Sequence, residues 1–316
     1  MPRNYKKKRK LARARAILTV VLPLHLRTYV ANKASPTKRT LMDWDERLQL
    51  SEKEFTRRYR LNKQKFKYVS ALLSNQKQAA SKYHRGWFWE SKKVSTDLKL
   101  SMTLRWLAGG DYKDVGDLHG VEASNTFYKH VWSTISALIK EPELDLPLMR
   151  EGGRPDLISC PELLAPLVKQ YNLRSEGVFK DCWGALDGTA IKIRCPSHNG
   201  PAYYCRKGFH AFNVQVICDS NHRVLWCSVC CAGAIHDSTA FSSTKLAEIL
   251  RDPNHPISKL RFWLAGDDAY SGCAAVMNSN LMCPYKGRNL DEWRDAFNFW
   301  QSSCRKTVEC TLGNMP

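Results

Sequence analysis

The hydrophobic positions along this chain follow two different periods. Between Trp44 and about Ile139, apolar residues such as Phe55, Tyr59 and Phe66 recur mostly at spacings near three and four, and charged residues fill the gaps. That period is typical of amphipathic helices. From about residue 180, apolar runs of strand length alternate with short turns. The pattern predicts an all-α region followed by an α/β region.

The helical region contains a pattern that resembles a helix-turn-helix. A helix over residues 98–108 should end at Gly109 and Gly110. Asp111 is placed to cap a short helix over residues 112–118, and residues 119–121 supply a turn with a central glycine. Ser124 is expected to cap the second helix.

In a DNA-reading helix-turn-helix, the outward residues of the second helix would be Asn125, Lys129 and His130. These would face the major groove, and Lys129 could also reach a phosphate. A plain pair of packed helices produces the same pattern, since every helical domain contains such pairs. The sequence leaves both interpretations open.

Proline and glycine punctuate the segment after the helices. Pro142, Pro147 and Pro155 accompany Gly152 and Gly153, which favours a connecting segment without regular structure. We therefore expect a linker over residues 141–179, and a separate domain from residue 180 onward.

The C-terminal region is expected to contain four strands and two helices. We predict strands over residues 183–193, 209–218, 224–231 and 261–265, with a turn at 219–222. A helix should open at residues 236–238 and run to about residue 250, and a final helix should begin near residue 291.

Three acidic residues occupy unusual places in these elements. Asp187 lies inside an otherwise apolar strand, where an unpaired buried carboxylate would be costly. Asp267 follows the end of another strand, where open sheets tend to build sites. Glu309 lies at the margin of the apolar stripe of the final helix. Each also has a structural explanation: a turn beside Gly188, a helix start, and an ion pair with Arg305 one turn earlier.

If these three acids converge, divalent cations would relieve their mutual repulsion. Hard oxygen ligands suit Mg²⁺ or Mn²⁺. Two such ions about 4 Å apart would activate a water or a 3′-hydroxyl and stabilise the leaving oxygen of a phosphodiester. Nearby, Arg206, Lys207 and His210 form a basic cluster suited to phosphate contact, although an exposed turn with solvated charges has the same composition.

The net charge of +19 is concentrated at the N-terminus. Residues 1–42 hold 12 Lys and Arg and no acid, with a dense block from Lys6 to Lys10. We expect a disordered basic tail that serves as a nuclear address or a phosphate-binding arm. The apolar residues 16–24 resemble a secretion signal, but no clean cleavage site follows them, so we favour the nucleus. No apolar run reaches the roughly 18 to 20 residues of a membrane span, so no membrane partner is expected.

The 12 cysteines all lie between Cys160 and Cys310. Cys227, Cys230 and Cys231 have zinc-like spacing, but they fall in a predicted strand whose alternate side chains face opposite ways. No second pair completes four ligands, so we interpret them as buried thiols.

Five blocks of the C-terminal region, in this order, resemble those of the PIF/Harbinger transposases. The blocks are Gly184-Ala185-Leu186-Asp187-Gly188-Thr189, Tyr204-Cys205-Arg206-Lys207-Gly208-Phe209-His210, Gly233-Ala234-Ile235-His236-Asp237-Ser238, Gly266-Asp267-Asp268-Ala269-Tyr270 and residues 305–313, Arg-Lys-Thr-Val-Glu-Cys-Thr-Leu-Gly. The resemblance covers residues 180–316 strongly, and residues 43–140 loosely through the helix-turn-helix.

The resemblance implies a ribonuclease-H-like catalytic domain with a mixed sheet over residues 180–316, preceded by the helical domain over residues 43–140. It implies a DDE triad that maps to Asp187, Asp267 and Glu309, and cleavage and strand transfer of DNA in the nucleus with Mg²⁺ or Mn²⁺. The partners it implies are DNA and a separate Myb-like DNA-binding protein, and association with further copies of the chain stays open. The alternative is a domesticated derivative that binds DNA or a protein without cutting.

The chain departs from the family pattern at several positions. Ala190 replaces a histidine, and Asp268 replaces the serine after the second aspartate, so Asp268 competes with Asp267 as the second acid; the Gly-Asp register favours Asp267. Asp237 is a further candidate, whose place at a helix start favours capping or support of a metal ligand. The sequence ends at Pro316, seven residues after Glu309, so we expect Glu309 on a weakly held helix end.

Overall fold

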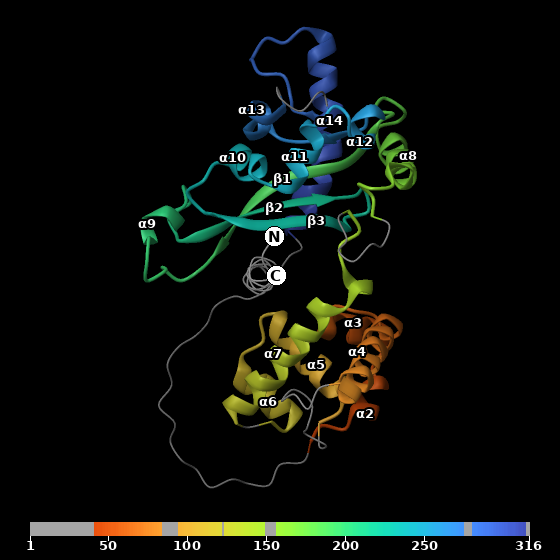
Figure 1. Ribbon diagram of the computed structural model, residues 1–316, viewed down its shortest axis with the longest axis vertical. Coiled ribbons are helices and arrows are strands. Elements are labelled where there is room, and N and C mark those ends of the chain that lie inside the picture. The colour runs from red at the N-terminus through yellow and green to blue at the C-terminus, as the bar shows by residue number, and fades with distance from the viewer. Residues whose placement is uncertain (1–40, 84–93, 122, 149–155, 275–279, 314–316) are drawn as a thin grey trace. The chain divides into compact units, whose positions relative to one another are not determined.

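A computed structural model describes residues 41–83, 94–121, 123–148, 156–274 and 280–313 (Figure 1). The chain divides into a helical unit that ends at Leu144 and an α/β unit that begins at Asp145. None of the described helices is long and apolar enough to cross a membrane.

Six α-helices and one 3₁₀ turn make up the described helical unit. They are α2 (Trp44–Leu48), α3 (Glu52–Tyr59), α4 (Lys63–Tyr83), α5 (Thr96–Leu107), α6 (Tyr112–His119), α7 (Ser124–Lys140) and η1 (Pro142–Leu144). Phe55, Tyr59 and Phe66 are fully buried at its centre, and the Trp44 ring stacks on Phe66 with centroids 4.7 Å apart. The periodicity therefore predicted both the helices and their core.

The α6–α7 pair has the predicted cap and turn. Asp111 Oδ1 accepts a hydrogen bond from Lys113 N at 2.8 Å, and Gly120 ends α6 with a φ of 72°, a conformation that favours glycine. Ser124 does not cap α7, however: Ala123 occupies the cap position and makes no side-chain bond. The fold of this pair does not establish a role in reading DNA.

One of the three residues expected to face outward from α7 is buried. Asn125 and Lys129 are exposed, but His130 is only 4% exposed. His130 follows Phe127 by about one turn and shares its face with Thr134, and all three side chains are buried. The expectation that His130 faces the major groove is therefore wrong in this structure.

The α/β unit is built on a five-stranded sheet in the order β3-β2-β1-β4-β5. The strands are β1 (Cys182–Lys192), β2 (Ala211–Cys218), β3 (Val224–Ala232), β4 (Trp263–Ala265) and β5 (Leu281–Met282). β1, β2 and β3 pair antiparallel, whereas β4 is parallel to β1 and β5 is parallel to β4. A mixed sheet of this kind, flanked by helices, is compatible with the expected ribonuclease-H-like domain.

Helices and short turns surround this sheet. They are η2 (Pro161–Leu164), α8 (Ala165–Arg174), α9 (Gly200–Tyr203), α10 (Asp237–Ser242), α11 (Lys245–Arg251), α12 (Pro256–Lys259), η3 (Asp268–Tyr270), α13 (Ser271–Ala274) and α14 (Glu292–Gly313). One apolar cluster joins α10 and α11 to one face of the sheet through residues such as Phe241, Leu246 and Ile217. A second cluster joins α14 to the other face through Cys304 and Val308.

Several elements differ from the expectations, which did not include the strand β5 or the short helices α9, α12 and α13. The predicted helix over residues 236–250 is broken into α10 and α11 because Thr244 Oγ1 accepts from Ala247 N at 3.2 Å and starts a new helix. The segment expected to be a linker over residues 141–179 contains η2 and α8, whose Leu164, Leu167 and Tyr171 are buried in the core of the α/β unit. The α/β unit therefore begins at Asp145 rather than at residue 180.

Candidate active site

Asp187 lies in the middle of β1, which is the central strand of the sheet. Its Oδ1 accepts a hydrogen bond from Gly188 N at 2.8 Å. Burial raises the pKa of Asp187 to about 6, and the nearby charges of Asp267 and Asp237 act in the same direction. The Gly188 bond and the Arg305 guanidinium oppose that rise. A carboxylate in this position would be stabilised by a cation.

Asp267 follows the end of β4, the strand that is parallel to β1. Ala265 of β4 pairs in parallel with Ala185 of β1, and each aspartate follows two residues later along its own strand direction. Asp267 is therefore carried to the same part of the sheet as Asp187, and its charge raises the pKa of Asp187. Asp267 Oδ1 also accepts from Ala269 N at 2.8 Å and begins η3, so the expected helix-start role is present as well.

Asp268 has a different environment from Asp267. Its carboxylate is exposed and forms an ion pair with Lys286 Nζ at 3.0 Å. Asp268 is not among the charges that shift the pKa of Asp187. Of the two adjacent acids, Asp267 is thus the one that the structure brings to Asp187.

Asp237 also lies near Asp187, although it comes from the start of α10. The cap of that helix is His236, so Asp237 is not the capping residue that its position suggested. Instead, Asp237 Oδ1 accepts hydrogen bonds from Asn213 Nδ2 at 2.7 Å and from Gln215 Nε2 at 3.2 Å. Its charge raises the pKa of Asp187.

Glu309 does not form a cluster of three acids with Asp187 and Asp267 in the part of the chain that the structure describes. Its carboxylate is 46% exposed and forms an ion pair with Arg305 Nη1 at 2.6 Å, one turn earlier in α14. Arg305, not Glu309, is among the charges that act on Asp187. The ion pair with Arg305, predicted as the structural explanation of Glu309, is therefore present. Arg305 interacts with both Glu309 and Asp187.

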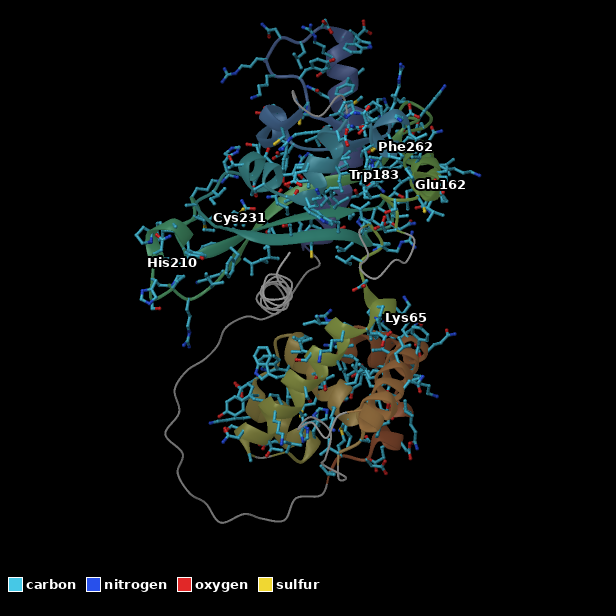
Figure 2. All side chains as sticks on the ribbon, viewed as in Figure 1. Lys65, Glu162, Trp183, His210, Cys231 and Phe262 are labelled. Carbon is cyan, nitrogen blue, oxygen red and sulfur yellow. The ribbon has the colours of Figure 1, made fainter. Side chains whose placement is uncertain are left out.

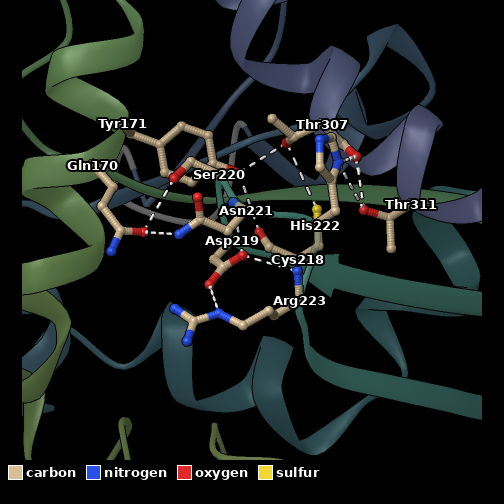
Figure 3. Close-up of polar contacts among 10 residues, drawn as sticks. All are labelled: Gln170, Tyr171, Cys218, Asp219, Ser220, Asn221, His222, Arg223, Thr307 and Thr311. Atoms are coloured by element: carbon tan, nitrogen blue, oxygen red, sulfur yellow. Dashed lines mark hydrogen bonds and ion pairs between the residues drawn. The ribbon is translucent and has the colours of Figure 1, made fainter. Parts of the chain in front are cut away.

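Contacts on the face of α14 opposite Glu309 fix the rotation of the last turns of this helix (Figure 3). Tyr171 OH lies 2.9 Å from Thr307 Oγ1, and His222 Nδ1 donates to Thr307 O at 3.0 Å. Thr307, Val308 and Thr311 are buried. Glu309 comes between these residues in the sequence, but the helical period places its side chain on the opposite face of α14. It therefore faces solvent and Arg305. The end of α14 is firmly packed rather than weakly held.

The donor set fits a divalent cation in part. The described residues contain no group of three or more His, Cys, Asp or Glu side chains close enough to hold a metal ion. Asp187 and Asp267 provide hard oxygen donors whose charges act on each other, which suits Mg²⁺ or Mn²⁺. Glu309 does not fit as a third ligand while Arg305 holds it.

The predicted phosphate-contact residues lie on the connection between β1 and β2. Arg206 and Lys207 are exposed and His210 is half-buried, and Figure 2 shows His210 beside α9, at the end of this connection. Residues 192–210 contain no Asp or Glu. The connection bonds to the segment before α10, since Ala234 N donates to Ala202 O at 3.1 Å. A basic surface therefore adjoins the segment that leads to Asp237.

Several polar residues of this region were missed by the sequence reasoning. Asn213 and Gln215 are buried on β2, Tyr270 OH donates to Gln215 Oε1 at 2.6 Å, and Arg305 acts on Asp187. Two amide side chains at alternate positions of an apolar strand were the available signal, because such groups need buried partners.

The mixed sheet and the acidic residues near neighbouring strands are compatible with the expected ribonuclease-H-like domain, and comparison with known proteins points to the same class. Residues 186–315 match the family model of the DDE superfamily endonucleases. The family resemblance expected from the five blocks is thereby confirmed.

The curated proteins include a distant relative of this chain. The protein named "Putative nuclease HARBI1" of Xenopus laevis is 24% identical over 101 residues, which are 32% of this chain and 26% of the relative. The match thus spans about a quarter of the length of that relative. No solved structure matches the chain significantly.

Proposed function

We propose that the α/β unit is a divalent-metal-dependent DNA endonuclease of the Harbinger transposase type, in which Asp187 and Asp267 bind the cation. The observation that carries this proposal is that Asp187 of β1 lies close to Asp267, which follows the neighbouring parallel strand β4. Burial raises the pKa of Asp187, and the charge of Asp267 raises it further. The match to the endonuclease family supports it. DDE superfamily endonucleases generally use divalent metals.

The residues of the chain would divide the work as follows. A bound Mg²⁺ or Mn²⁺ would supply an activated water and stabilise the leaving oxygen. Asp187 and Asp267, deprotonated, would hold the cation. Arg206, Lys207 and His210 would neutralise backbone phosphates of the DNA.

Glu309 would join the aspartates only after its ion pair with Arg305 opens. A DNA phosphate is a competing partner for the Arg305 guanidinium, because guanidinium groups bind phosphate in the same bidentate manner as carboxylate. Substrate binding would then free the third acid of the proposed DDE triad. In this proposal the triad is completed by DNA.

The helical unit and the tail are assigned by proposal as well. The α6–α7 pair would contact DNA through the exposed Asn125 and Lys129. The basic block of Lys6 to Lys10, which lies outside the described residues, would direct the protein to the nucleus. A Myb-like protein as a DNA-binding partner and association with further copies of the chain follow from the family resemblance alone.

A second candidate function is a derivative that binds DNA or a protein without cutting. The observation that favours it is the ion pair between Glu309 and Arg305, which occupies the third acid of the expected triad. The two functions share a fold and differ in whether the third acid reaches the aspartates.

Nicking of supercoiled DNA tests the proposal. The full chain is incubated with plasmid and Mn²⁺ or with EDTA, alongside the Asp187→Asn and Glu309→Gln variants. Asp181→Asn is the matched control, because Asp181 is exposed just before the same strand. We expect Mn²⁺-dependent nicking by the parent chain and by Asp181→Asn, and loss of nicking in the other two variants. A parent chain that binds plasmid but never nicks it supports the second candidate, and undiminished nicking by Asp187→Asn removes this residue from the mechanism.

A further inference from the structure

The connection between β1 and β2, residues 192–210, concentrates positive charge, and we call it the basic arm. It holds four Lys and Arg residues and no acid, so its charge is +4 with the histidines neutral. The rest of residues 180–316 holds 11 Lys and Arg against 12 Asp and Glu. Figure 1 shows α9, which belongs to the basic arm, at the end of the sheet far from α8. The surplus positive charge of the α/β unit thus lies in this arm.

A tight turn in the basic arm fixes the backbone around Tyr204. Tyr204 and His210 form an antiparallel bridge. Inside it, Cys205 N donates to Phe209 O and Gly208 N donates to Cys205 O, both at 2.9 Å. Gly208 has a φ of 84°, which favours glycine, and Cys205 is buried beneath the turn. The turn therefore holds Tyr204 in one defined place.

Tyr204 and its neighbour Tyr203 have opposite environments. The Tyr203 ring packs edge-on against Phe212 of β2, with centroids 5.4 Å apart. The Tyr204 side chain is 53% exposed, and its ring meets the edge of the His210 ring at 5.2 Å. An aromatic ring in water is apolar surface that a partner could cover with a gain in free energy. Tyr204 is thus an exposed ring on a fixed support.

The Tyr204 ring lies beside the positive charges of the turn. Its hydroxyl is 3.9 Å from the place that a Cβ atom on Gly208 would take. The two residues before Gly208 are Arg206 and Lys207, and both are exposed. Proteins bind unpaired nucleotides with this combination, because the ring stacks on the base and the cations neutralise the phosphate. Bases of duplex DNA are already stacked on one another, so such a ring gains most from an unpaired base.

We infer that Tyr204 stacks on an unpaired base of DNA, so that the basic arm selects single-stranded or locally opened DNA. The inference rests on the proposed function and names the form of DNA that enters the site. Lys192, where the basic arm begins, follows Asp187 by five residues on β1. At about 3.3 Å per residue this is about 17 Å. The unpaired base is therefore expected about five nucleotides from the cut, at about 3.4 Å per nucleotide.

Two variants of Tyr204 separate its ring from its hydroxyl. Tyr204→Ala removes both groups, whereas Tyr204→Phe keeps the ring. Because the side chain is exposed, each variant should melt within about 2 °C of the parent chain. Phe299→Ala is the matched control, since Phe299 is an exposed ring on α14, outside the basic arm.

The experiment measures DNA binding by the full chain through fluorescence anisotropy, in EDTA so that no cleavage occurs. The probes are a fluorescein-labelled oligothymidine and a duplex of the same length. We expect Tyr204→Ala to bind the oligothymidine about tenfold more weakly than the parent and the duplex within about twofold of it. Tyr204→Phe and Phe299→Ala should match the parent. The salt slope of Tyr204→Ala should equal that of the parent, because no charge is removed.

Several results would overturn the inference. They are parent-like binding of the oligothymidine by Tyr204→Ala, an equal loss on the duplex, and an equal loss in Tyr204→Phe, which would assign the contact to the hydroxyl. Competition by polyglutamate as strong as by unlabelled oligothymidine would also overturn it, since charge alone would then be recognised. Plasmid nicking by a chain that shows one of these results leaves the proposed function intact. Tyr204-dependent binding without nicking contradicts the proposed function alone, and a parent chain that binds neither probe contradicts both.

Discussion

The Gly188→Ala substitution tests the packing around the candidate site with a single added methyl group. The new Cβ would overlap Asp237 Oδ1 and would lie 2.7 Å from Gln215 Nε2, well inside van der Waals contact. Neither group can move freely, because Gln215 is held by Tyr270 and Asp237 is held by Asn213. The added methyl group must therefore displace the Asp237 carboxylate or distort β1.

The expected cost follows from overpacking a closed site. Inserting a methyl group into a packed interior typically costs about 1–3 kcal/mol. For a unit of this size, about 2 kcal/mol lowers the melting temperature by about 4–8 °C. Displacement of the Asp237 carboxylate, whose charge acts on Asp187, should also weaken Mn²⁺ binding.

Thermal unfolding followed by circular dichroism, together with a Mn²⁺ titration, measures both effects. Gly272→Ala is the matched control, because a Cβ atom at this exposed position of α13 meets nothing within 4 Å. We expect Gly272→Ala to unfold within about 2 °C of the parent chain. A Gly188→Ala variant as stable as Gly272→Ala, with unchanged Mn²⁺ affinity, would refute the close contact between Asp237 and β1.

Three further outcomes are expected. Burial lowers the pKa of both His119 and His130 to about 4, so folding favours their neutral rings. The stability of the helical unit should be constant above about pH 7.5 and fall by about 4 kcal/mol at pH 5, about 2 kcal/mol for each ring. Unchanged hydrogen-exchange protection of α5 to α7 between pH 7.5 and pH 5 would contradict this. Because the pKa of Asp187 is raised to about 6 and the cation needs the deprotonated form, Mn²⁺ affinity should fall about tenfold from pH 7 to pH 5, and a flat profile would exclude Asp187 as a ligand. Replacing Arg206 and Lys207 by Gln should lower the salt slope of DNA binding by about 2, whereas Lys169→Gln on the exposed side of α8 should leave it unchanged; equal slopes would remove the basic connection from the interface.

Local patterns were sufficient to predict most elements of the sheet. The apolar runs that became β1, β2 and β3 were recognised within about two residues of their ends, because their composition and bounding turns act locally. The proximity of Asp187 and Asp267 depends on the parallel pairing of β1 with β4, two strands far apart in the sequence. The sequence analysis expected it through the family resemblance and not from local patterns.

Features that depend on distant contacts could not be predicted. The rotation of α14, and with it the direction of Glu309, is fixed by Thr307 through Tyr171, a residue 136 positions away. The burial of His130 likewise depends on how the helices of its unit pack together. The inclusion of α8 in the core depends on a sheet whose strands all follow α8 in the sequence. Periodicity specifies a helix and its apolar stripe, but not the partner on which a marginal residue packs.

The most direct measurement is a crystal structure of the full chain soaked in Mn²⁺, with the metal located by its anomalous scattering. The account predicts a Mn²⁺ peak within about 2.3 Å of a carboxylate oxygen of both Asp187 and Asp267, with Asp237 still held by Asn213 and Gln215 behind β1. Mn²⁺ bound only elsewhere, with the carboxylates of Asp187 and Asp267 turned away from each other, would contradict it.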